Sequence, residues 1–217
     1  MVPDDRTGLP AAPPTGDAAS QAGGDLFGLR PWMATRGMTL EALVLADLSR
    51  NFRGGISTGK ETFRHLLEVS FTLDTAPIFG VEGGTFFLDF QTQDGRHGTE
   101  KLVGDFQGFS NIDAPGFTAL YELWYEQVLL DGRVRVKLGK IDANNEFAFV
   151  EHGDPLLNSS AGFSPTILGL PTYPNPATGA VLFASPAEGL YFGGGLFDGE
   201  TGDSLLISGL LAARQSL

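Results

Sequence analysis

Apolar and polar residues alternate most regularly in residues 62–74. One side carries Phe63, His65, Leu67, Val69, Phe71 and Leu73; the other carries Thr62, Arg64, Glu68, Ser70, Thr72 and Asp74, interrupted by Leu66. A period of two is typical of a β-strand with one apolar and one polar face. About 9–11 strand residues, tilted near 45°, cross the hydrocarbon of a bilayer, whereas strands of soluble domains more often have about 5–6 residues. The length of this segment therefore favours a strand of a membrane barrel.

A similar alternation in residues 117–141 predicts a β-hairpin. Asp131-Gly132 suits a two-residue type I′ turn, because both positions tolerate positive φ. A turn there sets these pairs: Leu130 with Arg133, Leu129 with Val134, Val128 with Arg135, Glu126 with Lys137, Trp124 with Gly139 and Leu123 with Lys140. A slip of one residue would move the charged residues to the apolar face, so the register is well specified.

The two faces of this hairpin differ in polarity. One face is mostly apolar and carries Tyr121, Leu123, Tyr125, Val134, Val136 and Leu138. The other carries Glu122, Trp124, Glu126, Arg135 and Lys137. We therefore expect an antiparallel hairpin with one apolar and one charged face.

Weaker alternation predicts strands in four further segments: residues 38–52, 83–93, 179–184 and 189–198, with Pro186 in the turn between the last two. Residues 1–25 are rich in Pro, Gly and Ala without periodicity and are expected to form a flexible tail. Residues 26–199 hold all the predicted strands, and residues 200–217 form a divergent C-terminal segment, either a helix or a frayed strand. The chain is therefore predicted to be all-β, with about seven or eight antiparallel strands.

Composition narrows the class of protein. The 217 residues include 30 Gly, 13 Pro, 17 Phe and no Cys, which suits strands joined by turns and excludes disulfides and thiolate metal sites. A net charge of −12 argues against nucleic acid as a partner, because phosphate binding needs clustered Lys and Arg. No run approaches 18 apolar residues, so no transmembrane helix is expected, whereas barrel strands give a near-neutral mean hydropathy such as the +0.02 found here. The N-terminus does not have the pattern of a signal peptide.

Seven stretches in series carry a family resemblance. They are GLRPWMATRGMTLE (28–41), NFRGG (51–55), VGDFQGFSNIDAP (103–115), LYELWYEQ (120–127), GKIDANNEF (139–147), LLNSSAGFSP (156–165) and LPTYPNPATG (170–179). In this order they resemble the carbohydrate-selective porins of the OprB family. The resemblance implies an antiparallel transmembrane β-barrel in the outer membrane of Gram-negative bacteria, with short periplasmic turns, long outer loops and a sugar-conducting lumen. It also implies outer-membrane lipid as a partner, sugars as solutes, a monomer or a homo-oligomer such as a trimer, and no cofactor.

The length of the chain suits only part of such a barrel. Barrels with an aqueous lumen typically have about 16–18 strands, and the chain has room for about half of them. It also ends in Gln-Ser-Leu, whereas outer-membrane barrels usually close on a strand with a terminal aromatic residue. We therefore interpret the sequence as the N-terminal half of a porin, shortened at both ends. A non-functional porin fragment is the accompanying alternative.

The charged face of the hairpin holds the predicted pore-lining residues: Glu122, Trp124, Glu126, Arg135 and Lys137. If the apolar face contacts lipid, this face must be the polar one, because Lys or Arg on a lipid surface costs roughly 2–4 kcal/mol at mid-bilayer. The alternative is a solvated hairpin whose cross-strand charge pair contributes about 0.2–1 kcal/mol. Trp124 could stack on a sugar or could pack beneath a loop, with Gly139 opposite leaving room.

Residues 142–178 form a connection that is too long for a turn and too apolar for a disordered linker. Its large apolar residues need burial, and fully burying one is worth roughly 1.5–3 kcal/mol. Because porins of this family narrow their lumen with inward-folded loops, the resemblance implies a constriction loop. Its predicted residues are Phe147, Phe149, Phe163 and Tyr173. The alternative is an outer lid packed on other loops or on a neighbouring subunit.

No catalytic site is expected. Glu122 and Glu126 would stand about 13 Å apart along a strand. Glycosidase carboxyls work at about 5–5.5 Å or about 6.5–9.5 Å. A soluble β-sandwich that binds sugar is the alternative fold, and it would need a second sheet against the apolar faces.

No metal site is expected either. Asp142, Asn144 and Glu146 lack the pattern of a calcium loop, and we interpret them as turn chemistry at a strand end. The run Gly193-Gly194-Gly195 lacks the Lys-Ser/Thr of a phosphate loop. It is expected to let another segment approach the backbone closely.

Overall fold

The computed structural model describes residues 24–105, 108–149, 156–158, 170–187 and 190–199. This part of the chain forms one antiparallel sheet of seven strands, each paired with its sequence neighbours. The strands are β1 (Met38–Arg50), β2 (Glu61–Asp74), β3 (Gly84–Gly95), β4 (Phe117–Leu129), β5 (Val134–Ile141), β6 (Ala177–Ala187) and β7 (Leu190–Phe197). The predicted all-β antiparallel fold is confirmed, and the β-sandwich alternative is wrong, because the described strands form a single sheet.

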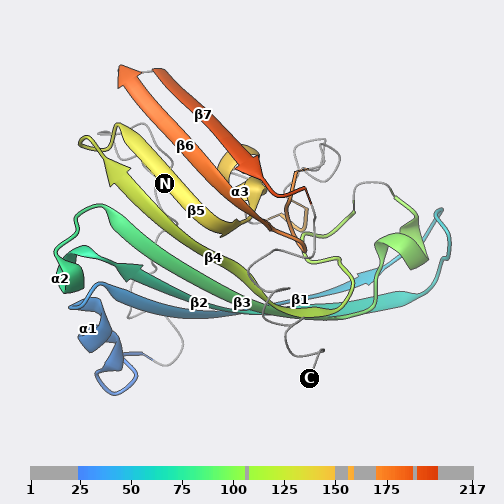
Figure 1. Cartoon of the computed structure of the whole chain (residues 1–217). Helices are drawn as coiled ribbons and strands as arrows, with labels where there is room; N and C mark the ends of the chain where they lie inside the picture. Colours follow the sequence, from blue (N-terminus) through green and yellow to red (C-terminus); the bar gives the residue numbers. More distant parts are fainter. Residues whose placement is uncertain (1–23, 106–107, 150–155, 159–169, 188–189, 200–217) are drawn as a thin grey trace, which may run out of the picture.

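The connections differ between the two ends of the curved sheet (Figure 1). Short ones lie at one end: the short helix α2 (Ala76–Phe79) and the β4–β5 turn, beside the helix α1 (Leu29–Ala34) that precedes β1. Long ones lie at the other end, including a π-helical turn, η2 (Thr99–Val103), and the helix α3 (Ala143–Phe147). In the described residues β1 and β7 are the edges of an open sheet. None of the helices described is long and apolar enough to cross a membrane.

The β4–β5 hairpin has the predicted register. Glu126 pairs with Lys137, and Trp124 pairs with Gly139. Asp131 and Gly132 have φ of 54° and 85°, and the amide of Arg133 donates to the carbonyl oxygen of Leu130 over 3.2 Å. These are the positive φ angles that a type I′ turn requires, but Leu130 also has a positive φ of 53° and lies outside β4. The expected ladder pair of Leu130 with Arg133 is therefore wrong, because pairing ends at Leu129 and Val134.

The two faces of the sheet have opposite polarity, and the polar face is the buried one. The buried polar residues on the inner face include Thr62, Arg64, Ser70, Asp89, Gln91, Gln93, Glu122 and Lys137. The outer face is apolar and exposed across the strands, through Val44, Leu48, Phe63, Leu67, Phe86, Leu88, Phe90, Leu123, Leu138, Leu182, Phe192 and Leu196. This distribution is the reverse of that in a soluble domain, where apolar side chains are usually the buried ones.

A β-bulge corrects one predicted face. Asp89 pairs with Glu122, but its successor Phe90 pairs with Leu120, so Tyr121 is an extra residue on β4. The expectation that Tyr121 shares the outer face with Leu123 is wrong, because Tyr121 is only 4% exposed. A bulge places two residues of one strand opposite one residue of the other, which changes which residues face inward.

The end of β6 also differs from the prediction. β6 continues to Ala187 and therefore contains Pro186, which was expected in a turn. The pairing with β7 is irregular between Ala184 and Ala187. Pairing of β6 with β5 stops at Ala184, so Pro186 lies where its missing N–H removes no bond to β5.

Candidate functional site

Four charged side chains form a buried network on the inner face. Arg135 Nη1 lies 2.7 Å from Glu126 Oε2, and Arg135 Nη2 lies 2.7 Å from Glu146 Oε2. Lys137 Nζ lies 2.5 Å from Glu146 Oε1 and 3.3 Å from Glu126 Oε2. We call these four residues the hairpin network. With two cations and two carboxylates it is neutral, and each carboxylate contacts both cations.

Glu146 joins the hairpin network from α3, outside the sheet. Asp142 caps this helix, because its Oδ1 accepts from the amide of Asn144 over 2.8 Å. The interpretation as turn chemistry at a strand end is therefore confirmed for Asp142 but is wrong for Glu146, whose carboxylate forms ion pairs with Arg135 and Lys137. Burial alone would raise the pKa of Glu146, but Lys137 and Arg135 outweigh burial and hold this pKa below its ordinary value of 4.5.

Glu122 lies on the same face but serves α3. Its Oε1 accepts from the amide of Asp142 over 2.8 Å, and its Oε2 accepts from Asn145 Nδ2 over 3.4 Å. Tyr121, turned inward by the bulge, donates its hydroxyl to Asp142 Oδ2. Two neighbouring residues of β4 thus fix the start of α3.

Trp124 is held by contacts on its ring. The Lys137 ammonium lies 3.8 Å from the ring centroid, and the Phe87 ring is stacked on it at 4.8 Å between centroids. The indole also packs against a small buried cluster: Ile141, Val181 and Phe183. These contacts favour the packing role over sugar stacking, which stays a prediction.

A second ion cluster was missed in the sequence. Arg64 on β2 is fully buried, and its guanidinium lies 2.6 Å from Asp47 and 2.9 Å from Asp113. It also donates to Ser49 over 2.7 Å, while Ser110 donates to Asp47 over 2.7 Å. We call these five residues the Arg64 cluster. The cation near the start of the polar face of residues 62–74 was the available signal.

The Arg64 cluster fastens the β3–β4 connection to the wall. Asp113 accepts from the amides of Gly98 and Thr99 over 3.1 and 2.7 Å. Burial alone would raise the pKa of Asp113, but hydrogen bonds from Thr99 and Gly98 and the charge of Arg64 hold this pKa below its ordinary value of 3.8. The same side chain thus orders the connection and binds it to β2.

The two long connections contact each other. The amide of Asn111 donates to the carbonyl of Leu157 over 2.8 Å, and Asn158 Nδ2 donates to the carbonyl of Gly108 over 2.5 Å. The Tyr173 ring lies 5.6 Å from that of Phe117 between centroids. The inner side of the sheet is therefore bridged from the Arg64 cluster to the β5–β6 connection.

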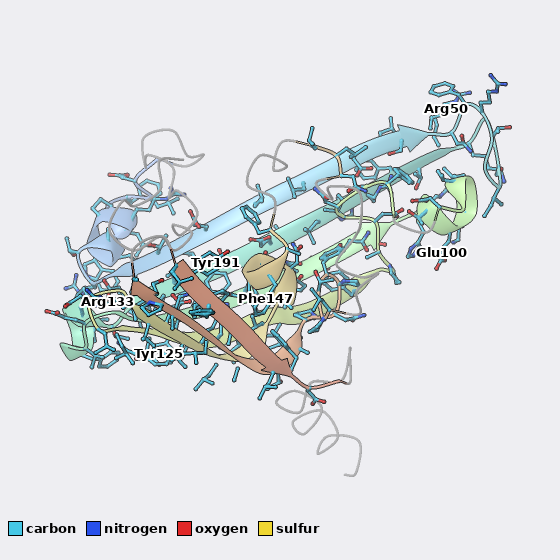
Figure 2. All side chains as sticks on the ribbon, turned by 90° about the horizontal axis from the view of Figure 1, so that it is seen from above. Arg50, Glu100, Tyr125, Arg133, Phe147 and Tyr191 are labelled. Atoms are coloured by element: carbon cyan, nitrogen blue, oxygen red, sulfur yellow. The ribbon has the colours of Figure 1, made fainter. Side chains whose placement is uncertain are left out.

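Phe147 is the predicted constriction residue with the clearest contacts. Its ring stacks on Phe183 at 5.6 Å and meets Phe197 edge-on at 6.3 Å. Figure 2 shows it on α3, within the curve of the sheet. A Cβ on Gly195 would lie 3.2 Å from the Phe147 ring, and one on Gly193 only 2.1 Å from that of Phe183. The expected close approach to this glycine run is confirmed.

The remaining predicted loop residues have different outcomes. Phe149 is 53% exposed. The hydroxyl of Tyr173 donates to the carbonyl of Ile112 over 3.4 Å. Phe163 lies outside the described residues.

Among the residues that the structure describes, no group of three or more His, Asp or Glu side chains is placed to hold a metal ion.

The fold and the inner face define a class of protein. An antiparallel sheet with an apolar outer surface and a polar, charged inner surface is the architecture of outer-membrane β-barrels. Residues 60–210 match the family described as carbohydrate-selective porin, OprB family. The chain belongs to this family, because the match covers more than half of its 217 residues.

A solved structure has the same fold. The OprB of Pseudomonas putida, solved at high pH, superposes with a TM-score of 0.73 at 19% sequence identity. The superposition covers 86% of this chain and 48% of that chain, so this chain spans about half the length of the porin it matches. No curated protein matches the sequence significantly.

Proposed function

We propose that the intact protein is an outer-membrane porin through which carbohydrates diffuse passively along a water-filled lumen. The observation that carries this proposal is the inverted polarity of the sheet, whose inner face concentrates buried charges while its outer face is apolar. Family membership supports sugars as the solutes. Luminal charged and aromatic side chains would select solutes by size and hydrogen bonding. The proposal includes no catalytic step and no energy source.

The five residues predicted from the hairpin are proposed to act in two ways. The charge of the lumen wall is set by Glu126, Arg135 and Lys137. The positions of α3 and of the hairpin against this wall are held by Glu122 and Trp124. The contacts of Glu146 with both cations support an inward position for α3. We propose that α3 and the connection after it narrow the lumen.

Swelling of liposomes that contain the intact protein tests the function. Neutral mono- and oligosaccharides should enter faster than charged solutes of similar size. Swelling no faster than that of protein-free liposomes would contradict a pore. Equal rates for sugars and charged solutes would indicate a general porin instead.

Ion selectivity tests the lumen-wall residues separately. Lys137→Gln leaves the hairpin network with one cation and two carboxylates, so the reversal potential in a salt gradient should shift toward cation preference. Arg133→Gln makes the same change of charge at an exposed position in the β4–β5 turn and is the matched control. An equal shift in both variants would contradict a luminal role for Lys137.

A further inference from the structure

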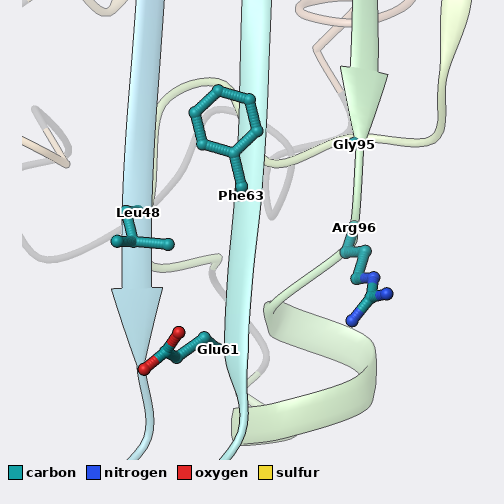
Figure 3. A pocket seen from close by; sticks show the side chains of 5 residues that line it. All are labelled: Leu48, Glu61, Phe63, Gly95 and Arg96. Carbon is teal, nitrogen blue, oxygen red and sulfur yellow. The ribbon is translucent and has the colours of Figure 1, made fainter.

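A groove on the outer face of the sheet lies where the strands reach the long connections (Figure 3). Leu48 of β1 pairs with Phe63 of β2, and the amide of Arg96, just after β3, donates to the carbonyl of Phe63 over 3.0 Å. Leu48, Phe63 and Arg96 therefore form a row across three neighbouring segments. Glu61 and Gly95 complete a groove of about 420 Å³.

The floor of this groove is apolar and continuous with the outer face. Leu48 and Phe63 are 69% and 52% exposed, although both are large apolar side chains. Leu48 lies on the same outward side of β1 as Val44, and Phe63 lies on the same outward side of β2 as Leu67. The groove thus extends the surface that the proposed function places in lipid.

The two charged side chains that line the groove differ in their ion pairs within the described residues. Glu61 is paired with Arg50 at 3.1 Å. Among the described residues, no acidic side chain forms an ion pair with Arg96. Asp94 stands one row closer to the middle of the sheet, where its Oδ1 accepts from the amide of Gly95 over 2.7 Å. Arg53 and Lys60 are exposed in the adjoining β1–β2 connection, so this rim is richer in cations than the acidic chain as a whole.

We propose that this groove binds a phosphorylated, acylated glycolipid of the surrounding membrane, with a phosphate on Arg96 and an acyl chain along Leu48 and Phe63. The inference rests on the proposed function, because it needs the outer face to contact lipid. A guanidinium is the side chain best suited to phosphate oxygens, which it binds by paired N–H donors. Long loops mark the outer end of such barrels, and the outer leaflet of a Gram-negative outer membrane is built from phosphorylated glycolipid. An aliphatic and an aromatic side chain directly beside the cation give the acyl chain its apolar surface.

Lipid retention by the purified intact protein tests the proposal. Wild type, Arg96→Gln and Phe63→Ala are reconstituted with lipid A, washed in detergent, and assayed for bound lipid by native mass spectrometry. One surface cation is worth about fivefold in binding an anionic lipid, so Arg96→Gln should retain about fivefold less. Lipid A stripped of its phosphates should be retained poorly by wild type and variant alike. Arg133→Gln is the matched control, because Arg133 lies at the opposite end of the sheet from Arg50 and this groove (Figure 2).

Several results would overturn the proposal. They are equal retention by wild type and Arg96→Gln, undiminished retention of the dephosphorylated lipid, or displacement by inorganic phosphate alone, which would indicate a free-anion site. Phosphatidylglycerol retained as well as lipid A would exclude a glycolipid.

Unchanged channel conductance in Arg96→Gln shows that the variant folds. Conductance also separates the two proposals: a wild type that passes sugar but retains no lipid contradicts only this inference, whereas one that retains lipid but passes no sugar contradicts only the proposed function.

Discussion

The hairpin network and the Arg64 cluster differ in how their ion pairs are divided among the side chains. Both hold charged groups inside the sheet, and both fasten a connection to the wall. In the hairpin network each carboxylate contacts two cations, so the loss of one group leaves the others partnered. In the Arg64 cluster one guanidinium serves two carboxylates, so everything depends on one side chain. The comparison predicts that the two sites differ in their sensitivity to single substitutions.

The largest effect is expected from Arg64→Met, which keeps much of the side-chain length and removes the charge. Asp47 and Asp113 would then lie close together without a cation. Removing one partner of a buried ion pair costs roughly 3–5 kcal/mol, and chemical unfolding in lipid vesicles should show a loss of that size. Adding Asp47→Asn and Asp113→Asn should recover part of it. A loss below about 1 kcal/mol would contradict the dependence on Arg64.

A smaller effect is expected from Glu146→Gln. Arg135 and Lys137 would both keep Glu126, so the cost should be about that of one hydrogen bond to a charged group, roughly 1.5–3 kcal/mol. Hydrogen exchange should rise at residues 143–147 and stay unchanged at residues 96–103, which the Arg64 cluster holds. Increased exchange in both segments would show that the two sites are not independent.

Acidification should weaken both sites in the same direction. The folded-state pKa values of Glu146 and Asp113 are lowered from 4.5 and 3.8. A lowered folded pKa gives a stability contribution that is complete above the ordinary pKa and is lost as the pH falls through the folded value. Unfolding free energies should therefore drop progressively as the pH falls below these ordinary values of 4.5 and 3.8. Glu146→Gln and Asp113→Asn should each flatten this dependence. A steeper dependence in either variant would contradict the assignment.

The smallest effect on stability is expected from Phe147→Ala. The residue is 39% exposed, so truncation should cost less than the roughly 3–5 kcal/mol typical of a fully buried Phe. Single-channel conductance should nevertheless rise, because the ring lies on α3, inside the curve of the sheet. Phe79→Ala, in α2 at the other end, is the matched control and should leave conductance unchanged. Equal conductance in wild type and Phe147→Ala would contradict a narrowing role for α3.

The hairpin could be predicted because its information is local. Asp131-Gly132 fixes the turn, and a period of two then assigns each residue to a partner and a face. The faces of residues 62–74 followed in the same way. The bulge at Tyr121 shifts the phase of the alternation by one residue, but it could not be predicted, because residues 117–120 (FTAL) alternate too weakly in polarity to show the shift.

The Arg64 cluster lay beyond sequence reasoning for a different reason. Arg64 and Asp47 are 17 residues apart on adjacent strands, so their contact follows once β1 and β2 are paired. Asp113 lies in an irregular connection, and the path of that connection depends on the ion pair that Asp113 makes with Arg64. The Phe147 contacts likewise depend on α3, a helix that no periodic pattern of apolar residues predicted. The strands of the sheet could thus be predicted from the sequence, whereas the connections folded onto its inner face could not.

The bulge at Tyr121 also lets β4 hold one residue more than its partner without changing its two faces. Before it, Phe117 and Ala119 face inward; after it, Glu122, Trp124 and Glu126 do. Because Asp89 and Phe90 are neighbours on β3 and pair with Glu122 and Leu120, deletion of Tyr121 would leave a regular ladder with both sets still facing inward. The deletion would remove the second inward side chain opposite Asp89, and with it the hydroxyl bound to Asp142 at the start of α3. The additional residue therefore serves the connection that follows β5 rather than the faces of the sheet.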